Sequence, residues 1–169
     1  MYNNLITLSI FFILLSFSAT AQKLTLEPSP QSQSLELGNR AWYFVYVTND
    51  TKKPLGLFGS PQKEFKVAHY EYVVFCNNKE IMRRTTSSLD TNEKFEDFRI
   101  STLPIGERKL MLGLREFPMK ETGTYRIEFS YTQDPANVDN RYAKNGKAKK
   151  AVKSVTPFSA KTVHEFVVE

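Results

Sequence analysis

The stretch Glu121-Thr122-Gly123-Thr124-Tyr125-Arg126-Ile127-Glu128-Phe129-Ser130-Tyr131 decides the fold of this chain. From Thr124 onward, polar residues alternate with Tyr, Ile, Phe and Tyr. Successive side chains of a strand point to opposite faces of a sheet, so this alternation predicts a strand that is buried on one side only. A sheet with one buried and one solvated face is typical of antiparallel pairing. We therefore expect an antiparallel strand over this stretch.

The entry to this strand has the order acidic residue, x, Gly, x, Tyr, from Glu121 through Gly123 to Tyr125. This order resembles the corner before strand F of immunoglobulin-like sandwiches, where a Tyr hydroxyl bonds back to the upstream backbone. Ile127 stands where antibody domains carry their second cysteine. The resemblance implies an immunoglobulin-like fold and a structural role for Gly123 and Tyr125. It implies nothing specific about function, because many functions share this fold.

Further short runs along the chain predict the remaining strands. They are apolar or alternating and are bounded by turn residues such as Asn77-Asn78, which tolerate positive φ in a hairpin loop. The turn Leu103-Pro104-Ile105-Gly106-Glu107 and the strand before Asn49 resemble those of exported bacterial immunoglobulin-like domains. The predicted strand segments are 23–27 continued by 34–37, 41–48, 68–76, 79–86, 95–100, 110–114, 124–131 and 161–168, with a short segment over 55–58 between the second and the third. The fold class expected is all-β, an antiparallel immunoglobulin-like β-sandwich of about eight or nine strands.

The N-terminal residues predict a secretory signal peptide. Leu5 to Phe17 is an apolar run of 13 residues, followed by the small-residue pattern Ala19-Thr20-Ala21. Such a run is too short to span about 30 Å of hydrocarbon as a helix. We expect cleavage near Ala21-Gln22, a single domain over 22–169 without a transmembrane segment, and a secreted, periplasmic or cell-surface location.

Cys76 is the one cysteine of the chain, so no internal disulfide is expected even in an oxidising compartment. It closes the apolar alternation of 68–76, and we interpret it as a small buried apolar residue. The length of 22–169 is enough for one hydrophobic core, so stability is expected to come from packing.

The basicity of the chain is local. Six of its 23 Lys and Arg residues lie within 141–153, a range without acidic residues, and the remaining 17 face all 18 acidic residues. This range belongs to a polar loop predicted over 134–154, and loops of that length are usually functional or disordered. The candidate interaction residues are Arg141, Lys144, Lys147, Lys149, Lys150 and Lys153. They fit either a solvated hairpin tip or an arm for a protein, an anionic glycan or a membrane surface, but not nucleic acid, since no aromatic platform accompanies the lysines.

Catalytic and metal-binding signals are weak. His69 and His164 each stand alone in a predicted strand, without a second ligand at zinc spacing. The sequence has no nucleophile elbow, zinc-protease motif or phosphate-binding Gly loop. Carboxylates at 90, 93, 96 and 97 do not follow calcium-loop spacing. We expect no enzyme activity, no catalytic residues, no cofactor and no metal.

Two functions remain open. One is an exported binding or structural module that contacts a protein or envelope component through its loops or the basic hairpin, including an inhibitor-like mode. The other is a carbohydrate-binding sandwich in which Trp42, Tyr43 or Tyr46 stack on sugar; the alternative for Trp42 and its neighbours is a structural role in the core. A flat row of solvent-facing rings favours sugar, whereas inward rings leave loops and edges for protein contact.

Overall fold

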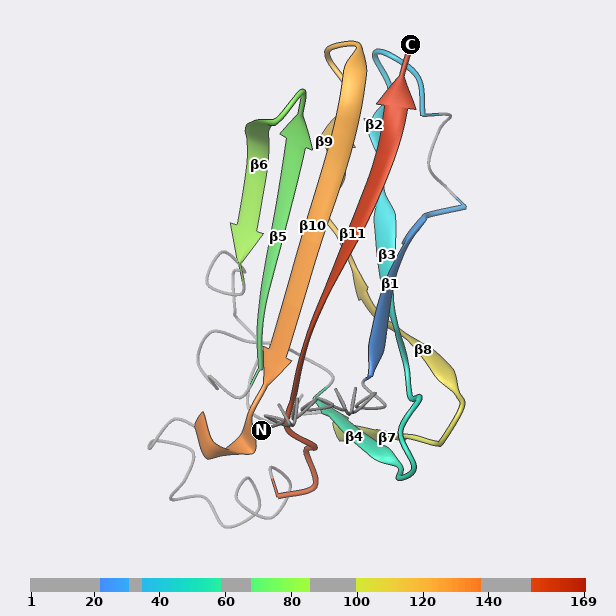
Figure 1. The fold of residues 1–169 in the computed structure, drawn as a ribbon, viewed down its shortest axis with the longest axis vertical. Coiled ribbons are helices and arrows are strands. Elements are labelled where there is room, and N and C mark those ends of the chain that lie inside the picture. Colours follow the sequence, from blue (N-terminus) through green and yellow to red (C-terminus); the bar gives the residue numbers. More distant parts are fainter. Residues whose placement is uncertain (1–21, 31–34, 59–67, 86–99, 138–152) are drawn as a thin grey trace, which may run out of the picture.

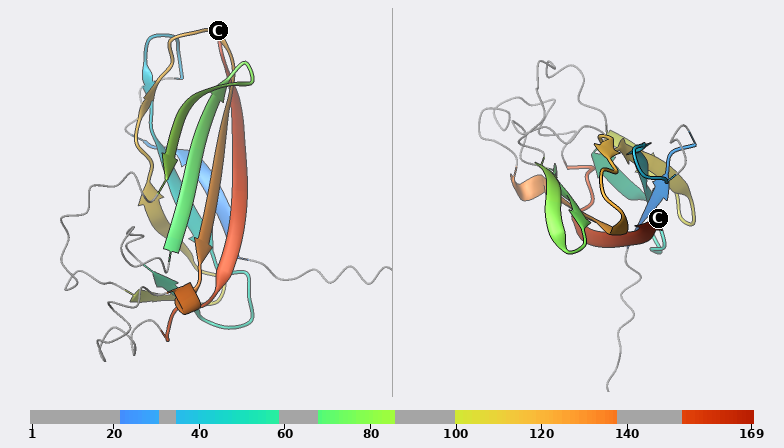
Figure 2. Two further views of the ribbon diagram at one scale, coloured as in Figure 1. Left: turned by 90° about the vertical axis from the view of Figure 1, so that its left-hand side faces the viewer. Right: turned by 90° about the horizontal axis from the view of Figure 1, so that it is seen from above.

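The computed structural model describes residues 22–30, 35–58, 68–85, 100–137 and 153–169. Within these ranges the chain is all-β, with eleven strands in antiparallel pairs and one short 3-10 segment, η3 (Pro135–Asn137). The strands form two facing layers, an arrangement compatible with a β-sandwich (Figures 1 and 2). The expectation of an all-β antiparallel fold is confirmed.

The first layer is a four-stranded sheet in the order β11-β10-β5-β6. Its bounds are β5 (Ala68–Cys76), β6 (Lys79–Thr85), β10 (Gly123–Gln133) and β11 (Phe158–Val168). Residues 123–131 of the stretch 121–131 lie in β10, between β5 and β11. Its inward residues pair with inward residues of both neighbouring strands. The predicted strand over 161–168 is confirmed and begins three residues earlier than expected.

The second layer contains the three-stranded sheet β1-β3-β8, and two short strand pairs accompany it, β2-β9 at the upper end and β4-β7 across the lower end (Figure 1). The bounds in this layer are β1 (Lys23–Pro28), β2 (Arg40–Ala41), β3 (Tyr43–Thr48), β4 (Leu55–Phe58), β7 (Ile100–Leu103), β8 (Arg108–Gly113) and β9 (Phe117–Pro118). Strand β1 lies beside β11, so the two layers approach each other along that side (Figure 1).

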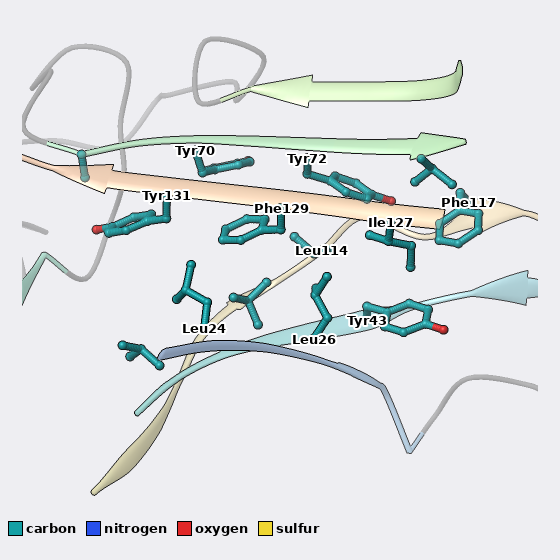
Figure 3. Close-up of a cluster of buried hydrophobic side chains, with 14 of the residues drawn as sticks. Leu24, Leu26, Tyr43, Tyr70, Tyr72, Leu114, Phe117, Ile127, Phe129 and Tyr131 are labelled. Atoms are coloured by element: carbon teal, nitrogen blue, oxygen red, sulfur yellow. The ribbon is translucent and has the colours of Figure 1, made fainter. Parts of the chain in front are cut away.

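The core lies between the layers and is rich in aromatic rings (Figure 3). From β10 it receives four side chains with no more than 1% exposure, Tyr125, Ile127, Phe129 and Tyr131. From β3 it receives Tyr43, Val45 and Val47, which are at most 1% exposed. Ring pairs such as Tyr125–Phe166 (centroids 5.4 Å apart) bridge neighbouring strands. Burial of this apolar area is the main term that stabilises the fold.

The Asn77-Asn78 hairpin joins β5 to β6 as predicted, with φ of 49° and 64° at the two residues. The Asn77 side chain also reaches the chain before β10: its Nδ2 donates to the Thr122 carbonyl (3.1 Å), and its Oδ1 accepts from the Thr124 N–H (3.1 Å). Gly123 lies between these two residues with φ of 133°. A Cβ at Gly123 would lie 2.1 Å from Asn77 Oδ1, so the structural role expected for Gly123 rests on both conformation and space.

Three details of the predicted strands are wrong. Residues 35–37 form no strand, because the Asn39 N–H bonds to the Glu36 carbonyl in a turn and Gly38 adopts φ of 86°. A β-bulge opposite Val45 and Tyr46 breaks the period of β8, so Leu110 is 47% exposed while Leu114 is 3% exposed. The strand count is eleven among the described residues, against eight or nine expected, because strands as short as those of the pair β2-β9 show no alternation. Of the predicted strand 95–100, only Ile100 lies within the described residues.

Candidate functional site

The candidate site is the end of the layers opposite the Asn77 hairpin (Figure 1). There, Ala68 at the start of β5 and Phe158 at the start of β11 both pair with Gln133, the last residue of β10. Phe58 and Ile100 pair with each other at the same end. The connections 59–67 and 138–152, and the C-terminal side of 86–99, therefore attach to one small region of the fold.

The Gln133 side chain is 1% exposed, and its hydrogen bonds hold this region together. Its Oε1 accepts hydrogen bonds from the Phe58 N–H (3.1 Å) and the Tyr131 hydroxyl (3.0 Å). Its Nε2 donates to the carbonyls of Gly56 (2.7 Å) and Thr156 (2.5 Å). All four hydrogen-bonding positions of the amide are thus used, which is what a buried side-chain amide requires.

The segment before β11 packs directly onto Gly56 of β4. Thr156 exchanges two bonds with this glycine: its N–H donates to the Gly56 carbonyl (3.0 Å), and its Oγ1 accepts from the Gly56 N–H (2.9 Å). The Ser154 carbonyl oxygen would lie 1.8 Å from any Cβ at position 56. Only glycine allows this approach. The C-terminal end of the basic range is consequently anchored to the layers one residue after Lys153.

Of the six candidate interaction residues, Lys153 is the one that the structure describes, and it is exposed in a turn. Arg141, Lys144, Lys147, Lys149 and Lys150 lie outside the described residues. The structure therefore describes both ends of the predicted loop, η3 on one side and Ser154 to Thr156 on the other, and the second end is bonded to Gly56.

The aromatic residues proposed as a sugar platform divide between the two faces of β3. Tyr43 is in the core, whereas Trp42, Phe44 and Tyr46 are half-buried on the outer face. The rings of Trp42 and Phe44 meet at 67° and those of Phe44 and Tyr46 at 86°, so the row is not flat. The Arg108 guanidinium lies over the Tyr46 ring, 3.8 Å from its centroid, and forms an ion pair with Glu27. Trp42 packs edge-on against Phe44 and is half-buried, so it lies outside the core in which the structural alternative placed it.

The isolated titratable residues do not assemble into a reaction centre within the described ranges. His69 is exposed, and His164 is half-buried against the Tyr43 ring, with centroids 5.2 Å apart. Burial lowers the pKa of His164 below its usual range. No group of three His, Cys, Asp or Glu side chains among the described residues is placed to hold a metal ion.

Cys76 is buried, with 3% exposure, as predicted from the alternation. It lines a pocket of about 150 Å³ together with Phe117, Met82 and Tyr125. We interpret Cys76 as a packing residue, because it lies near the rings of Phe117 and Tyr125 and the thioether of Met82.

Asn49 shows why the Asn-x-Thr pattern at 49–51 forms a turn. Its side chain is fully buried, and its Nδ2 donates to the carbonyls of Lys53 and Leu103, both at 2.9 Å. The Oδ1 accepts from the Thr51 N–H and hydroxyl. A glycosylation acceptor must expose this amide, so the pattern is structural here.

Sequence reasoning missed Gln133 and Gly56. Gln133 continues the buried phase of β10 that begins at Tyr125, and a polar residue in that phase signals a buried hydrogen-bonding side chain. Gly56 carried no such signal, because its need for close approach comes from residues about a hundred positions away.

No family model, no curated protein and no solved structure matches this chain. Among the described residues, no helix is both long and apolar enough to cross a membrane.

Proposed function

We propose that the chain is an exported, non-catalytic binding module with an immunoglobulin-like β-sandwich fold, which contacts a protein partner through the end of the layers around Gln133. The observation that carries this proposal is the buried hydrogen-bond network of Gln133, which fixes the attachment points of the connections at that end. Binding surfaces are often built from loops that a rigid scaffold positions. The basic range 141–153 attaches there and would supply the charge.

Electrostatic attraction is the natural mode of binding for such a segment, since the range 141–153 carries six positive charges and no acidic residue. Charged patches steer association with oppositely charged partners and make it dependent on salt. The partner would present an acidic surface and lie in the envelope or outside the cell; an inhibitor-like contact with a protease belongs to the same class.

Carbohydrate binding through the outer aromatic row is the second candidate, and the geometry favours it less. Sugar stacking uses exposed ring faces, whereas Phe44 lies edge-on to both neighbours and Arg108 covers Tyr46.

A capture experiment from the cell envelope, run beside a glycan array, separates the two. We expect a protein to be retained by the wild-type chain and released by salt, and we expect no glycan signal that depends on Trp42. Glycan binding that is lost in Trp42→Ala, together with no retained protein, would overturn the proposal.

A further inference from the structure

The arginines of the described residues fall into two groups. Four of them contact a carboxylate: Arg40–Glu116 (2.8 Å), Arg83–Glu80 (2.6 Å) with Arg83–Glu71, Arg108–Glu27, and Arg126–Glu128 (3.4 Å). Arg84 and Arg115 contact none within the described part of the chain. These two arginines line the same pocket, of about 60 Å³.

Arg84 occupies an inward position of β6. It pairs with Tyr72 of β5, just as Met82 pairs with the fully buried Val74. The pocket lies between the edge strand β6 and the end of β8 with the residues that follow it, where Arg115 is located. The Tyr72 hydroxyl donates to the Arg115 carbonyl (2.8 Å) and so holds the two walls of the pocket together.

The Nε–H of Arg84 is buried and has no acceptor within the described residues. A buried donor without an acceptor costs about 1–3 kcal/mol, and more when the group is charged. The Nε of Arg126 is also unpaired, but a second nitrogen of that guanidinium binds Glu128. Arg84 therefore retains an unmet requirement for an acceptor, and an anionic acceptor would meet it most strongly.

The tyrosines of the pocket do not meet this requirement. Burial raises the pKa values of Tyr70 and Tyr72, and the Arg84 charge lowers them only in part, so both side chains stay neutral at physiological pH. Arg84 is half-buried and Arg115 is exposed, so the pocket is open to a ligand on the Arg115 side.

We propose that this pocket binds a carboxylate, held between the guanidinium groups of Arg84 and Arg115. A carboxylate is planar and matches the fork of N–H donors of a guanidinium, which makes charge-assisted pairs stronger than neutral hydrogen bonds. The small volume admits one such group and not a large ligand. This site stands independently of the function proposed for the Gln133 end.

The competing explanation is that Arg84 protects the edge. Inward-pointing charges on edge strands discourage pairing with another chain, and β6 is an edge strand. That role needs no ligand and no second arginine.

Arginine Nε–H signals in ¹H–¹⁵N spectra report on each guanidinium directly. We would titrate ¹⁵N-labelled protein with sodium acetate, with acetyl-Gly-Glu-Gly-amide and with inorganic phosphate, at constant ionic strength set with chloride. The proposal predicts saturable shifts of the Arg84 and Arg115 signals with carboxylates, in roughly the millimolar range for so small a ligand. Tighter binding of the peptide than of acetate would identify a protein carboxylate as the ligand, and the reverse order a free one.

Variants assign the response to the pocket. Arg84→Lys and Arg115→Lys keep the charge but remove the fork, and each should weaken the carboxylate response at the remaining arginine at least fivefold. Arg40→Lys is the matched control, because Arg40 already has Glu116, and it should change nothing. If Arg84→Lys does not fold, Arg115→Lys, at an exposed position, carries the test. The proposal would be overturned by the absence of a saturable shift, by shifts with phosphate alone, or by equal shifts at Arg108. Arg84 would then be a residue that prevents the edge strand β6 from pairing with another chain.

Discussion

The hydroxyl of Tyr125 donates a hydrogen bond to the backbone carbonyl of Glu121 at 3.0 Å, and the hydroxyl oxygen accepts one from the Glu121 N–H at 3.4 Å. The Tyr125 ring is 1% exposed and stacks on Phe117 and Phe166. The corner inferred from five residues of sequence is therefore formed, and it links the chain that enters β10 to the core between the layers.

Replacing Tyr125 with Phe should lower the free energy of unfolding by about 1 kcal/mol or more, because the Glu121 carbonyl loses its partner while the ring stays packed. Chemical denaturation followed by fluorescence would measure the change. Thr124→Val, at an exposed position of the same strand, serves as the control and should have a much smaller effect. A midpoint unchanged in Tyr125→Phe would show that the hydrogen bond is energetically irrelevant.

Gly123 and Gly106 should differ in the cost of an added Cβ, and φ is 133° at Gly123 but 74°, close to the left-handed helical region, at Gly106. Both have positive φ, but a Cβ at Gly106 meets nothing within 4 Å, whereas one at Gly123 runs into the Asn77 amide. Gly106→Ala should cost about 1–2 kcal/mol, the conformational term alone. Gly123→Ala should cost more, and the excess should shrink in an Asn77→Gly background. Equal costs for the two glycines would contradict the packing role of Asn77.

Much of the fold could be predicted from the sequence, because local patterns determine it, whereas features that depend on contacts between distant residues could not. The alternation through Tyr125 fixes which face of β10 is buried, and Asn77-Asn78 fixes a hairpin, because both are local properties of the chain. The bulge that exposes Leu110 depends on the register between β3 and β8, which no local pattern states. The role of Gln133 depends on Phe58 and Thr156, which are distant in sequence.

Gln133→Leu tests whether the loop end is held by its amide. The substitution keeps the size but removes the bonds that Gln133 makes to the Phe58 N–H and the Thr156 carbonyl, and one of the two bonds at the Gly56 carbonyl, which keeps the Thr156 N–H. A buried group left unpaired costs about 1–3 kcal/mol. We expect a loss of at least about 2 kcal/mol in unfolding free energy and faster amide exchange in β4. Thr132→Val, next in the strand and exposed, is the control. A loss no larger than that of the control would mean that the network does not hold this end.

His164 should make stability depend on pH. Its pKa is lowered in the folded state by burial, so protonation favours the unfolded chain. Its contribution is intact above the unfolded-state pKa of about 6.5 and is lost as the pH falls toward the folded-state value. Unfolding free energies at pH 7.5 and 5.0 should differ less in His164→Gln than in the wild type. His69→Gln, at an exposed position, should keep the wild-type difference; a difference unchanged in His164→Gln would exclude this source.

Cys76→Ala should fold to the same structure and retain any binding, because the thiol has a packing role and its removal only enlarges the pocket beside Phe117. Partner capture and a melting curve would be compared with those of the wild type. Loss of capture with an unchanged melting temperature would assign chemistry to the thiol.

The central claim is that the basic range 141–153 is the interaction arm of the Gln133 end, and charge removal tests it most directly. Lys144, Lys147, Lys149 and Lys150 would be replaced by Gln, beside a control with Gln at four exposed lysines elsewhere, Lys52, Lys79, Lys109 and Lys120. Retention on anionic vesicles or resin and capture of the envelope partner would be measured with rising salt, since exposed charges are screened over about 8 Å at physiological ionic strength. We predict an unchanged melting temperature and loss of retention in the first variant only. Equal retention in both variants that also survives high salt would contradict the account and place any partner site on the layers themselves.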